Sequence, residues 1–255
     1  MFSKSQVASI LLALFAVASV NAHGAIVAVA GDNGITGQAF GIVDSTPRDG
    51  TKRNPFQADT SIIRDKEIAS GDAQACGRTL AGGVNDMAAQ LAAASSAGLA
   101  SVGSDGSVAM TVHQINGDGA GPYTCDVSAD ASGQNFVAME VTTNVPGQNS
   151  RSQAKATDFP LVAQMPAGTT CTGGPDGDAC VVRCRNAARA GPFGGCVPVT
   201  NAAPAGGNST TTKRDVTIAE AEEALREDME RRSVKSEKKR YLRTRIAGAK
   251  AGYWI

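Results

Sequence analysis

The sequence contains only two histidines, His23 and His113. His23 directly follows the small-residue pattern Val20-Asn21-Ala22, where a signal peptidase is expected to cut, so it becomes the first residue of the mature chain. A histidine in first position offers two nitrogen ligands, its α-amine and one imidazole nitrogen, and His113 offers a third. Three such nitrogens suit copper, which leads the divalent metals in affinity. The α-amine has an ordinary pKa of about 8, so a metal displaces its proton near neutral pH.

Each histidine also has a purely structural interpretation. His23 would then be an incidental first residue, and His113 would sit at the edge of a strand predicted at 107–113. We favour the metal site because the two histidines fall at two special places, the mature N-terminus and the end of a strand. The prediction is one copper ion per chain, with His23 and His113 as its metal ligands.

Residues 1–22 have the features of an export signal. They carry one charge, Lys4, before an apolar run at 7–20, which is too short to cross about 30 Å of hydrocarbon. No other segment reaches about 18 apolar residues, so we expect no membrane span. The protein is predicted to be secreted, and to be extracellular or bound at the cell surface.

The six cysteines are even in number and belong to an exported chain, which predicts three disulfides with 15 possible connectivities. They are Cys76, Cys125, Cys171, Cys180, Cys184 and Cys196. A zinc site built on Cys180 and Cys184 is the alternative, but no histidine lies near them in the sequence.

The composition is globular, with 42% hydrophobic residues among 255 and 29 glycines. The net charge of +0 argues against a whole-chain polyanion binder, so no nucleic-acid partner is predicted. Aromatic residues make up only 4%, which makes a broad aromatic binding face unexpected. We expect a monomer.

Short strands separated by Gly, Pro and Asp predict a mainly β fold. One helix is predicted, at 86–96. The strands are predicted at 24–30, 107–113, 135–145, 159–165 and 180–183. This pattern favours an antiparallel, immunoglobulin-like β-sandwich at 23–200, with long loops and disulfide bonds.

A separate tail follows this domain. Residues 201–216 form a flexible linker by composition, and the Asn208-Ser209-Thr210 sequon predicts a glycoprotein. Residues 217–255 are predicted as a charged helical or disordered tail; residues 213–255 hold 12 Lys/Arg and 8 Asp/Glu. Proteolytic processing at Lys213-Arg214 and a simple solvated helix face remain alternatives for the basic pairs.

The surroundings of the histidines resemble the histidine brace of lytic polysaccharide monooxygenases. Their mature chains begin with His, often His-Gly, a second His comes from mid-chain, and a Tyr or Phe three residues before a Cys lies on the axial side of the copper. Here the motif FGGC occupies 193–196. The resemblance implies a copper-dependent oxidoreductase with His23, His113 and Phe193 as catalytic residues. It also implies a disulfide between Cys76 and Cys196.

A second resemblance extends through the body of the chain. Segments 106–125 (GSVAMTVHQINGDGAGPYTC) and 180–199 (CVVRCRNAARAGPFGGCVPV), and the final AGYWI, resemble the fungal appressorium-associated secreted virulence factors of the MAS and GAS type. This resemblance implies a fungal protein secreted during infection or surface penetration.

Two functions follow as alternatives. One is a copper oxidase acting on a host or cell-wall polysaccharide. The other is a non-catalytic secreted virulence factor that binds copper or a host surface. For the enzyme, the scarcity of exposed aromatics, with mainly Tyr123 available, favours a soluble or acidic polymer, and Gln114 is the candidate for the polar residue expected near the axial position. A small basic cluster near Phe193 consists of Arg183, Arg185 and Arg189. These arginines are expected either to contact an acidic polysaccharide or to support the site residues, or, as we favour, to be solvated charges on a disulfide loop.

Overall fold

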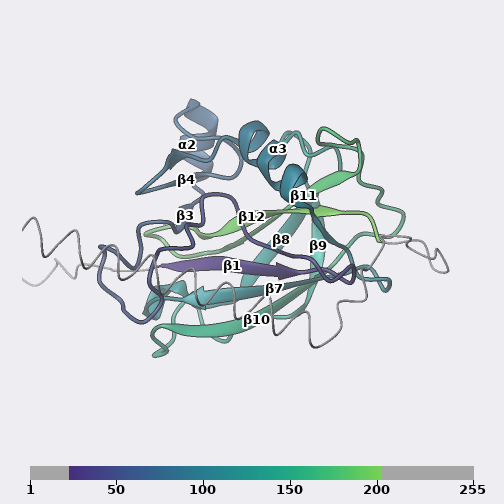
Figure 1. The fold of residues 1–255 in the computed structure, drawn as a ribbon. Helices are drawn as coiled ribbons and strands as arrows, with labels where there is room; N and C mark the ends of the chain where they lie inside the picture. The colour runs from purple at the N-terminus through teal and green to yellow at the C-terminus, as the bar shows by residue number, and fades with distance from the viewer. Residues whose placement is uncertain (1–22, 203–255) are drawn as a thin grey trace, which may run out of the picture. The chain divides into compact units, whose positions relative to one another are not determined.

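The computed structural model describes residues 23–202 of the chain (Figure 1). The domain predicted at 23–200 lies within them. The predictions for the signal peptide at 1–22 and the tail at 217–255 lie outside the described residues, as does nearly all of the linker predicted at 201–216, with its sequon.

Residues 23–202 form one 12-stranded sheet built from seven long and five short strands. The long strands are β1 (Gly24–Ala30), β7 (Ser107–Gln114), β8 (Tyr123–Ser128), β9 (Val137–Thr143), β10 (Thr157–Gln164), β11 (Ala179–Asn186) and β12 (Phe193–Thr200). The short strands are β2 (Thr36–Gly37), β3 (Ser61–Ile62), β4 (Arg78–Thr79), β5 (Gly83–Val84) and β6 (Ala100–Ser101). The order is β2-β1-β7-β10-β9-β8-β11-β12-β3-β4-β5, with β6 pairing parallel to β12 and all other pairs antiparallel.

The sheet folds back on itself at β9, which pairs with β10 on one side and with β8 on the other. As a result β1, from one half, packs beside β12, from the other half, as Figure 1 shows. Gly195 of β12 lies at this contact: a Cβ at this position would be 3.6 Å from Cβ of Ile26 on β1 and only 2.9 Å from Cβ of Ala39. Apolar side chains of both halves fill the space between them. They include Ile26, Val29, Val108, Met110, Val112, Val127, Leu161, Val182, Val197 and Val199.

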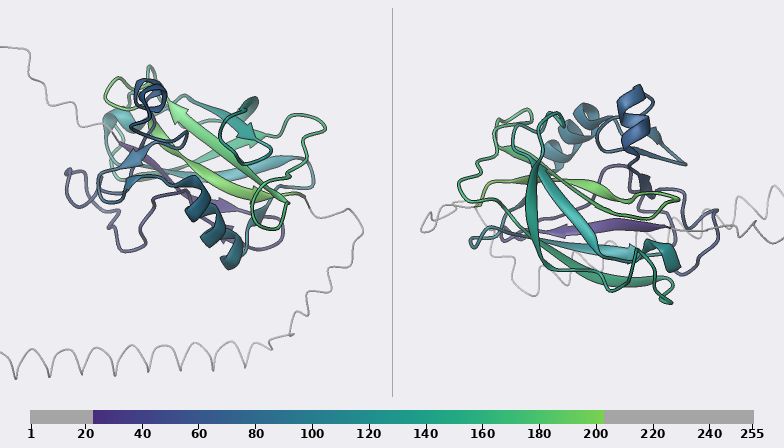
Figure 2. Two further views of the ribbon diagram at one scale, coloured as in Figure 1. Left: turned by 90° about the horizontal axis from the view of Figure 1, so that it is seen from above. Right: turned by 180° about the vertical axis from the view of Figure 1, so that it is seen from behind.

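Two helices, α2 (Asp65–Ser70) and α3 (Met87–Ala97), lie outside the half of the sheet that contains β11 and β12 (Figure 2). Asp86 caps α3, since its carboxylate accepts a hydrogen bond from the Ala89 N–H at 3.1 Å. A third, 3₁₀ turn, η1 (Gly117–Gly119), follows β7. Within residues 23–202 no helix is both long and apolar enough to cross a membrane.

The predicted mainly β, antiparallel class is confirmed. β1 has its predicted bounds, β7 runs one residue further than predicted, and α3 matches the predicted helix. The immunoglobulin-like sandwich is not confirmed, because hydrogen bonding continues through β9 in one sheet. β12 was missing from the prediction because its Gly194, Gly195 and Pro198 lack β propensity.

All six cysteines are paired, which confirms the prediction of three disulfides. The pairing of Cys76 with Cys196, implied by the resemblance to the monooxygenases, is confirmed. Cys125 on β8 bonds to Cys184 on β11, and Cys171 bonds to Cys180. Because Cys180 and Cys184 each have a different disulfide partner, the alternative zinc site does not exist.

Candidate functional site

β1 and β7 bring the two histidines to the same end of the sheet. Ala25 lies opposite His113 in the antiparallel register, and the Ile115 N–H donates to the His23 carbonyl at 3.0 Å, which extends the pairing to His23. Side chains alternate between the faces of a strand, so His23 and His113 lie on the same face as diagonal neighbours. At this separation long side chains on the two strands can reach a common ligand.

His113 is held in one orientation by Asp158. The two residues lie directly opposite each other on β7 and β10, and His113 Nδ1 is 2.6 Å from Asp158 Oδ1. Because a carboxylate only accepts hydrogen bonds, the proton belongs on Nδ1. The lone pair is then on Nε2, which is buried and has no hydrogen-bond partner within residues 23–202. A carboxylate on the outer nitrogen is the usual support for a metal-binding histidine.

His23 is held in its neutral form. Burial lowers the pKa of its imidazole from 6.5 to about 4, and the positive charge of Arg53 contributes in the same direction. Its Nδ1 is buried and makes no hydrogen bond to the described part of the chain. A neutral imidazole with an unused nitrogen has the protonation state that metal coordination requires.

These unpaired nitrogens belong to a local cluster. Seven buried side-chain nitrogen or oxygen atoms in residues 23–202 lack a hydrogen-bond partner, and four of them belong to His23 and to the end of β7 and its next turn. They are His23 Nδ1, His113 Nε2, Gln114 Oε1 and Asn116 Nδ2. Leaving a buried polar atom unpaired costs about 1–3 kcal/mol, so native proteins rarely concentrate such atoms without a ligand or water to pair them.

The site offers two imidazoles rather than a larger cluster of side-chain ligands. No group of three or more His, Cys, Asp or Glu side chains within residues 23–202 is arranged to hold a metal ion. The predicted site needs only His23 and His113 from the side chains, because its third nitrogen is a main-chain atom. The residues present therefore fit a three-nitrogen copper site.

Phe193, the first residue of β12, lies against His23. The ring centroids are 4.5 Å apart, and the planes are inclined by 36°. Phe193 is fully buried and packs with Ile62 and Ala188 in a small apolar cluster. The structure thus brings together all three residues singled out from the sequence: His23, His113 and Phe193.

Two other candidates lie away from this face. Gln114 points to the opposite side of β7 from His113, and its amide donates to Ser152 Oγ at 2.7 Å and to the Ala154 carbonyl at 3.0 Å. It is therefore not available as a polar neighbour of the metal. Tyr123, expected on the surface, is only 1% exposed, and its hydroxyl donates to the Gly119 carbonyl. That expectation was wrong.

Two of the three clustered arginines are engaged within the domain. Arg183 makes a bidentate ion pair with Asp126, at 2.9 and 2.6 Å, and lies over the ring of Phe136. Arg185 pairs with Asp65. Arg183 therefore connects β11 to β8 and Arg185 connects β11 to α2, so the interpretation of these two residues as solvated charges was wrong. Arg189 alone among the three is exposed.

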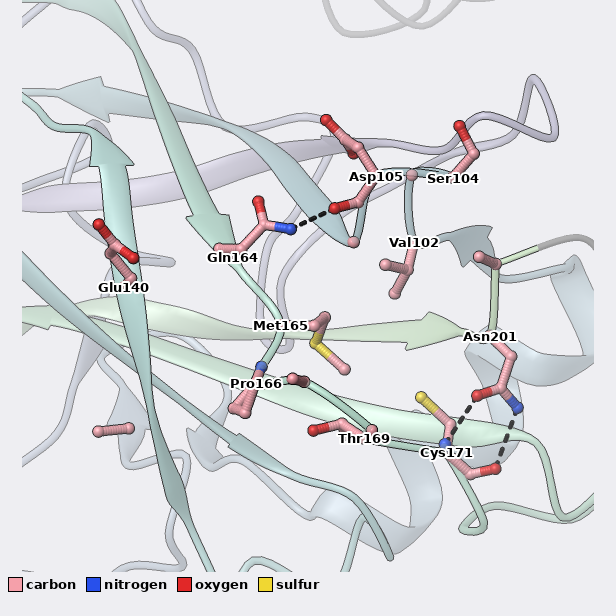
Figure 3. A pocket seen from close by; sticks show the side chains of 16 residues that line it. Val102, Ser104, Asp105, Glu140, Gln164, Met165, Pro166, Thr169, Cys171 and Asn201 are labelled. Atoms are coloured by element: carbon pink, nitrogen blue, oxygen red, sulfur yellow. Dashed lines mark hydrogen bonds between the residues drawn. The ribbon is translucent and has the colours of Figure 1, made fainter.

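A cavity of about 730 Å³ lies at the other end of the sheet (Figure 3). Gln164, which lines it, pairs with Ser107 at the start of β7, whereas His113 is near the end of the same strand. The lining includes the carboxylates of Asp105 and Glu140 but neither histidine. Figure 3 shows Gln164 bonded to the Asp105 main chain, so part of the polar lining is already engaged. We place the candidate site at the histidines, where buried imidazole nitrogens lack hydrogen-bond partners within residues 23–202.

Sequence reasoning missed two residues that support the histidines. One is Asp158, whose place beside His113 depends on the register between β7 and β10. The other is Asn116, whose Oδ1 accepts a hydrogen bond from the His23 main-chain nitrogen at 2.7 Å. Only the closeness of Asn116 to His113 in the sequence could have drawn attention to it.

Comparisons with known proteins agree with the second resemblance seen in the sequence. The chain is 48% identical over 200 residues to the appressoria-specific virulence factor GAS1 of Pyricularia oryzae strain 70-15, with 76% of each chain covered. It is 35% identical over 256 residues to the appressoria-specific virulence factor GAS2 of the same strain, covering 75% of this chain and 88% of that protein. No solved structure matches. The model of the Egh16-like virulence factor family matches residues 21–194, and the chain therefore belongs to the Egh16-like virulence factors.

Proposed function

We propose that the mature protein begins at His23 and binds one copper ion. The ligands are the α-amine of His23, Nδ1 of His23 and Nε2 of His113. The observation that carries the proposal is that both imidazole nitrogens are buried and unpaired within residues 23–202, and that they belong to side chains on the same face of the sheet. Amine and imidazole nitrogens are preferred copper ligands, and the donor set fits this metal.

The protein's own residues prepare this site. Asp158 keeps the proton of His113 on Nδ1, so that Nε2 stays free. The burial that lowers the pKa of His23 keeps its imidazole neutral. Phe193 covers one side of His23 and keeps water from that side. Bound copper would supply one-electron redox chemistry, and the protein would hold the polymer against it.

The relatives are named as appressoria-specific virulence factors, which supports a role in infection structures. We propose that this chain is secreted, acts as a monomer outside the cell, and oxidises a polysaccharide of the host or fungal cell wall. The proposal assigns His23, His113 and Phe193 to the catalytic site.

A non-catalytic role is the second candidate, and specific observations favour it. Gln114 faces away from the histidines, and Tyr123 is buried, so neither a polar neighbour of the copper nor a surface aromatic is supplied by these residues. In this case the protein would bind copper, or a host surface, without turning over a substrate.

Secreted protein with an authentic N-terminus distinguishes these possibilities. N-terminal sequencing should give His23; any other start removes the amine ligand and rules out the site. Calorimetric titration should then give one copper per chain. Copper-loaded protein is next incubated with a reductant, oxygen and a panel of soluble and insoluble polysaccharides. Oxidised oligosaccharides in mass spectra support the oxidase, whereas copper binding without oxidised products or peroxide turnover supports the non-catalytic role.

A further inference from the structure

We propose that Asn116 is the positioning residue for the N-terminus, holding the nitrogen of His23 in place through its side-chain carbonyl. As far as it concerns copper, this inference rests on the proposed function. The placement of the nitrogen itself is a property of the metal-free fold.

The only hydrogen bond of the Asn116 side chain within residues 23–202 is to His23. Its Oδ1 accepts from the His23 nitrogen at 2.7 Å, and its Nδ2 is buried without a partner. The partner is a donor, which identifies the amide oxygen as the atom facing it. Asn116 is 6% exposed, so this amide is kept in the interior although only one of its ends is used. If Asn116 served only to fill space, both the oxygen and the nitrogen of its buried amide would be expected to have hydrogen-bond partners.

Asn144 shows what a structural asparagine looks like in the same neighbourhood. Its Oδ1 accepts from the Tyr123 N–H at 2.8 Å, and its Nδ2 donates to the Tyr123 carbonyl at 2.9 Å. Both ends of that amide are satisfied by main chain. Asn116 differs because its single bond is to the nitrogen that becomes the α-amine of the mature chain.

The main chain around Asn116 is itself fixed. Its carbonyl accepts from the Gly119 N–H at 3.0 Å and from the Gln114 side chain at 3.1 Å. On the other side, the His23 carbonyl accepts from the Ile115 N–H. His23 is thus held at both its nitrogen and its oxygen by consecutive residues of the segment that follows β7.

Two glycines allow His23 and the start of β1 to lie close to the segment that follows β7. A Cβ at Gly119 would collide with the His23 carbonyl, and a Cβ at Gly24 would collide with the Tyr123 hydroxyl. That hydroxyl in turn donates to the Gly119 carbonyl at 3.0 Å. The first residues of β1 are therefore closely packed, and Asn116 supplies the oxygen that accepts a hydrogen bond from the His23 nitrogen.

This arrangement is compatible with coordination at the same nitrogen. A neutral amine bound to a metal through its lone pair keeps two N–H groups. One of them can donate to Asn116 Oδ1 while the lone pair is directed elsewhere. Asn116 would then orient the amine through a hydrogen bond without binding the metal itself, as Asp158 orients His113.

The test uses secreted mature protein and four variants: Asn116→Ala, Asn116→Leu, Asn116→Asp and, as the matched control, Asn144→Ala. Asn116→Leu fills the volume of the side chain in case the alanine variant does not fold. In metal-free protein at pH 9, above the ordinary pKa of an α-amine, a pulse of acetylating reagent labels accessible amines. Mass spectrometry measures the rate at His23. Calorimetry then measures copper affinity, and electron paramagnetic resonance records the nitrogen hyperfine pattern.

The α-amine should be acetylated several-fold faster in Asn116→Ala and Asn116→Leu, with the wild-type rate retained in Asn144→Ala. Copper affinity should fall about 10–100-fold in the first two variants, with an altered hyperfine pattern, and recover largely in Asn116→Asp, which keeps an acceptor. Equal acetylation rates in wild type and Asn116→Ala would overturn the proposal, as would unchanged copper affinity in a wild type that binds the metal. If wild type binds no copper yet acetylation accelerates, the positioning role stands and the copper function fails.

Discussion

The imidazole of His23 packs against the ring of Phe193, with ring centroids 4.5 Å apart. His23 immediately precedes β1, and Phe193 begins β12, so the contact closes one end of the folded sheet. The disulfide between Cys76 and Cys196 anchors β12 close to this contact. The position of His23 therefore depends on the last strand of the domain.

Loss of any one nitrogen ligand should weaken copper binding. His113→Ala removes an imidazole, and a methionine retained before His23 turns the α-amine into an amide. Each change removes a direct ligand, so affinity should fall by more than the 10–100-fold that is typical for outer partners of a ligand. Calorimetry measures the affinities, with Glu140→Gln, at the other end of the sheet, as the control that keeps wild-type affinity. Unchanged affinity in either altered protein would falsify the three-nitrogen site.

The carboxylate of Asp158 should matter although it is 63% exposed and touches no metal. Asp158→Ala frees the His113 ring to turn and to change tautomer, which should weaken copper binding about 10–100-fold. Asp158→Asn should lose less, because its amide oxygen still accepts from Nδ1. Copper titration measures both, and thermal melting of metal-free protein serves as the check on folding. Equal affinities in wild type and Asp158→Ala would show that His113 needs no such support.

The metal-free protein should lose stability as the pH falls from about 6.5 to 4. Burial lowers the pKa of His23 to about 4, so between these values the unfolded chain binds a proton that the folded chain does not. The free energy of unfolding therefore decreases in this window, and His23→Gln should remove that part of the decrease. Urea denaturation at several pH values measures it.

Glu67 provides an internal reference for this measurement. Arg78 and Arg64 lower the pKa of its carboxyl from 4.5 to about 2, so its contribution is lost mainly below the His23 window. A titration of His23 by nuclear magnetic resonance with a midpoint near 6.5 would contradict the predicted pH dependence.

The three disulfides should contribute unequally to stability. In the chain-entropy model, closing the 120-residue separation of Cys76 and Cys196 contributes about 5 kcal/mol, against about 2.6 kcal/mol for the 9-residue separation of Cys171 and Cys180. Replacing the first pair by serines should therefore destabilise more, and it should also loosen Phe193. Urea denaturation of the two double variants compares them; a larger loss for the shorter loop would contradict the entropic account.

The tail predicted from the sequence should be dispensable for the fold. Residues 213–255 hold no cysteine, so no disulfide connects them to the domain. A chain ending at Ala202 should keep its melting midpoint within a few degrees and keep its copper affinity. Limited proteolysis of the full chain should cut first within 201–216. A midpoint lowered by many degrees after truncation would show that the tail stabilises the domain.

The residue types and spacings of the sequence were enough for much of this description. A short apolar run revealed β1, and the alternation of apolar residues revealed β7, whose apolar side chains point to one face of the sheet. The predicted export signal and the even number of cysteines indicated disulfides, and the resemblance to the monooxygenases indicated the partner of Cys76. The two histidines stood out because the sequence contains no others, and because His23 lies at the predicted mature N-terminus and His113 at the end of a predicted strand.

The tertiary structure decided what surrounds those histidines. Which side chain lies opposite His113 depends on the register of β10, and register is a relation between two strands that neither strand carries alone. The contact between His23 and Phe193 depends on the sheet folding back at β9, which local patterns do not encode. In the sequence, Asn116 likewise has no feature that distinguishes it from an ordinary loop residue. Its role depends on a hydrogen bond to His23 that forms only when the start of β1 pairs with the segment after β7.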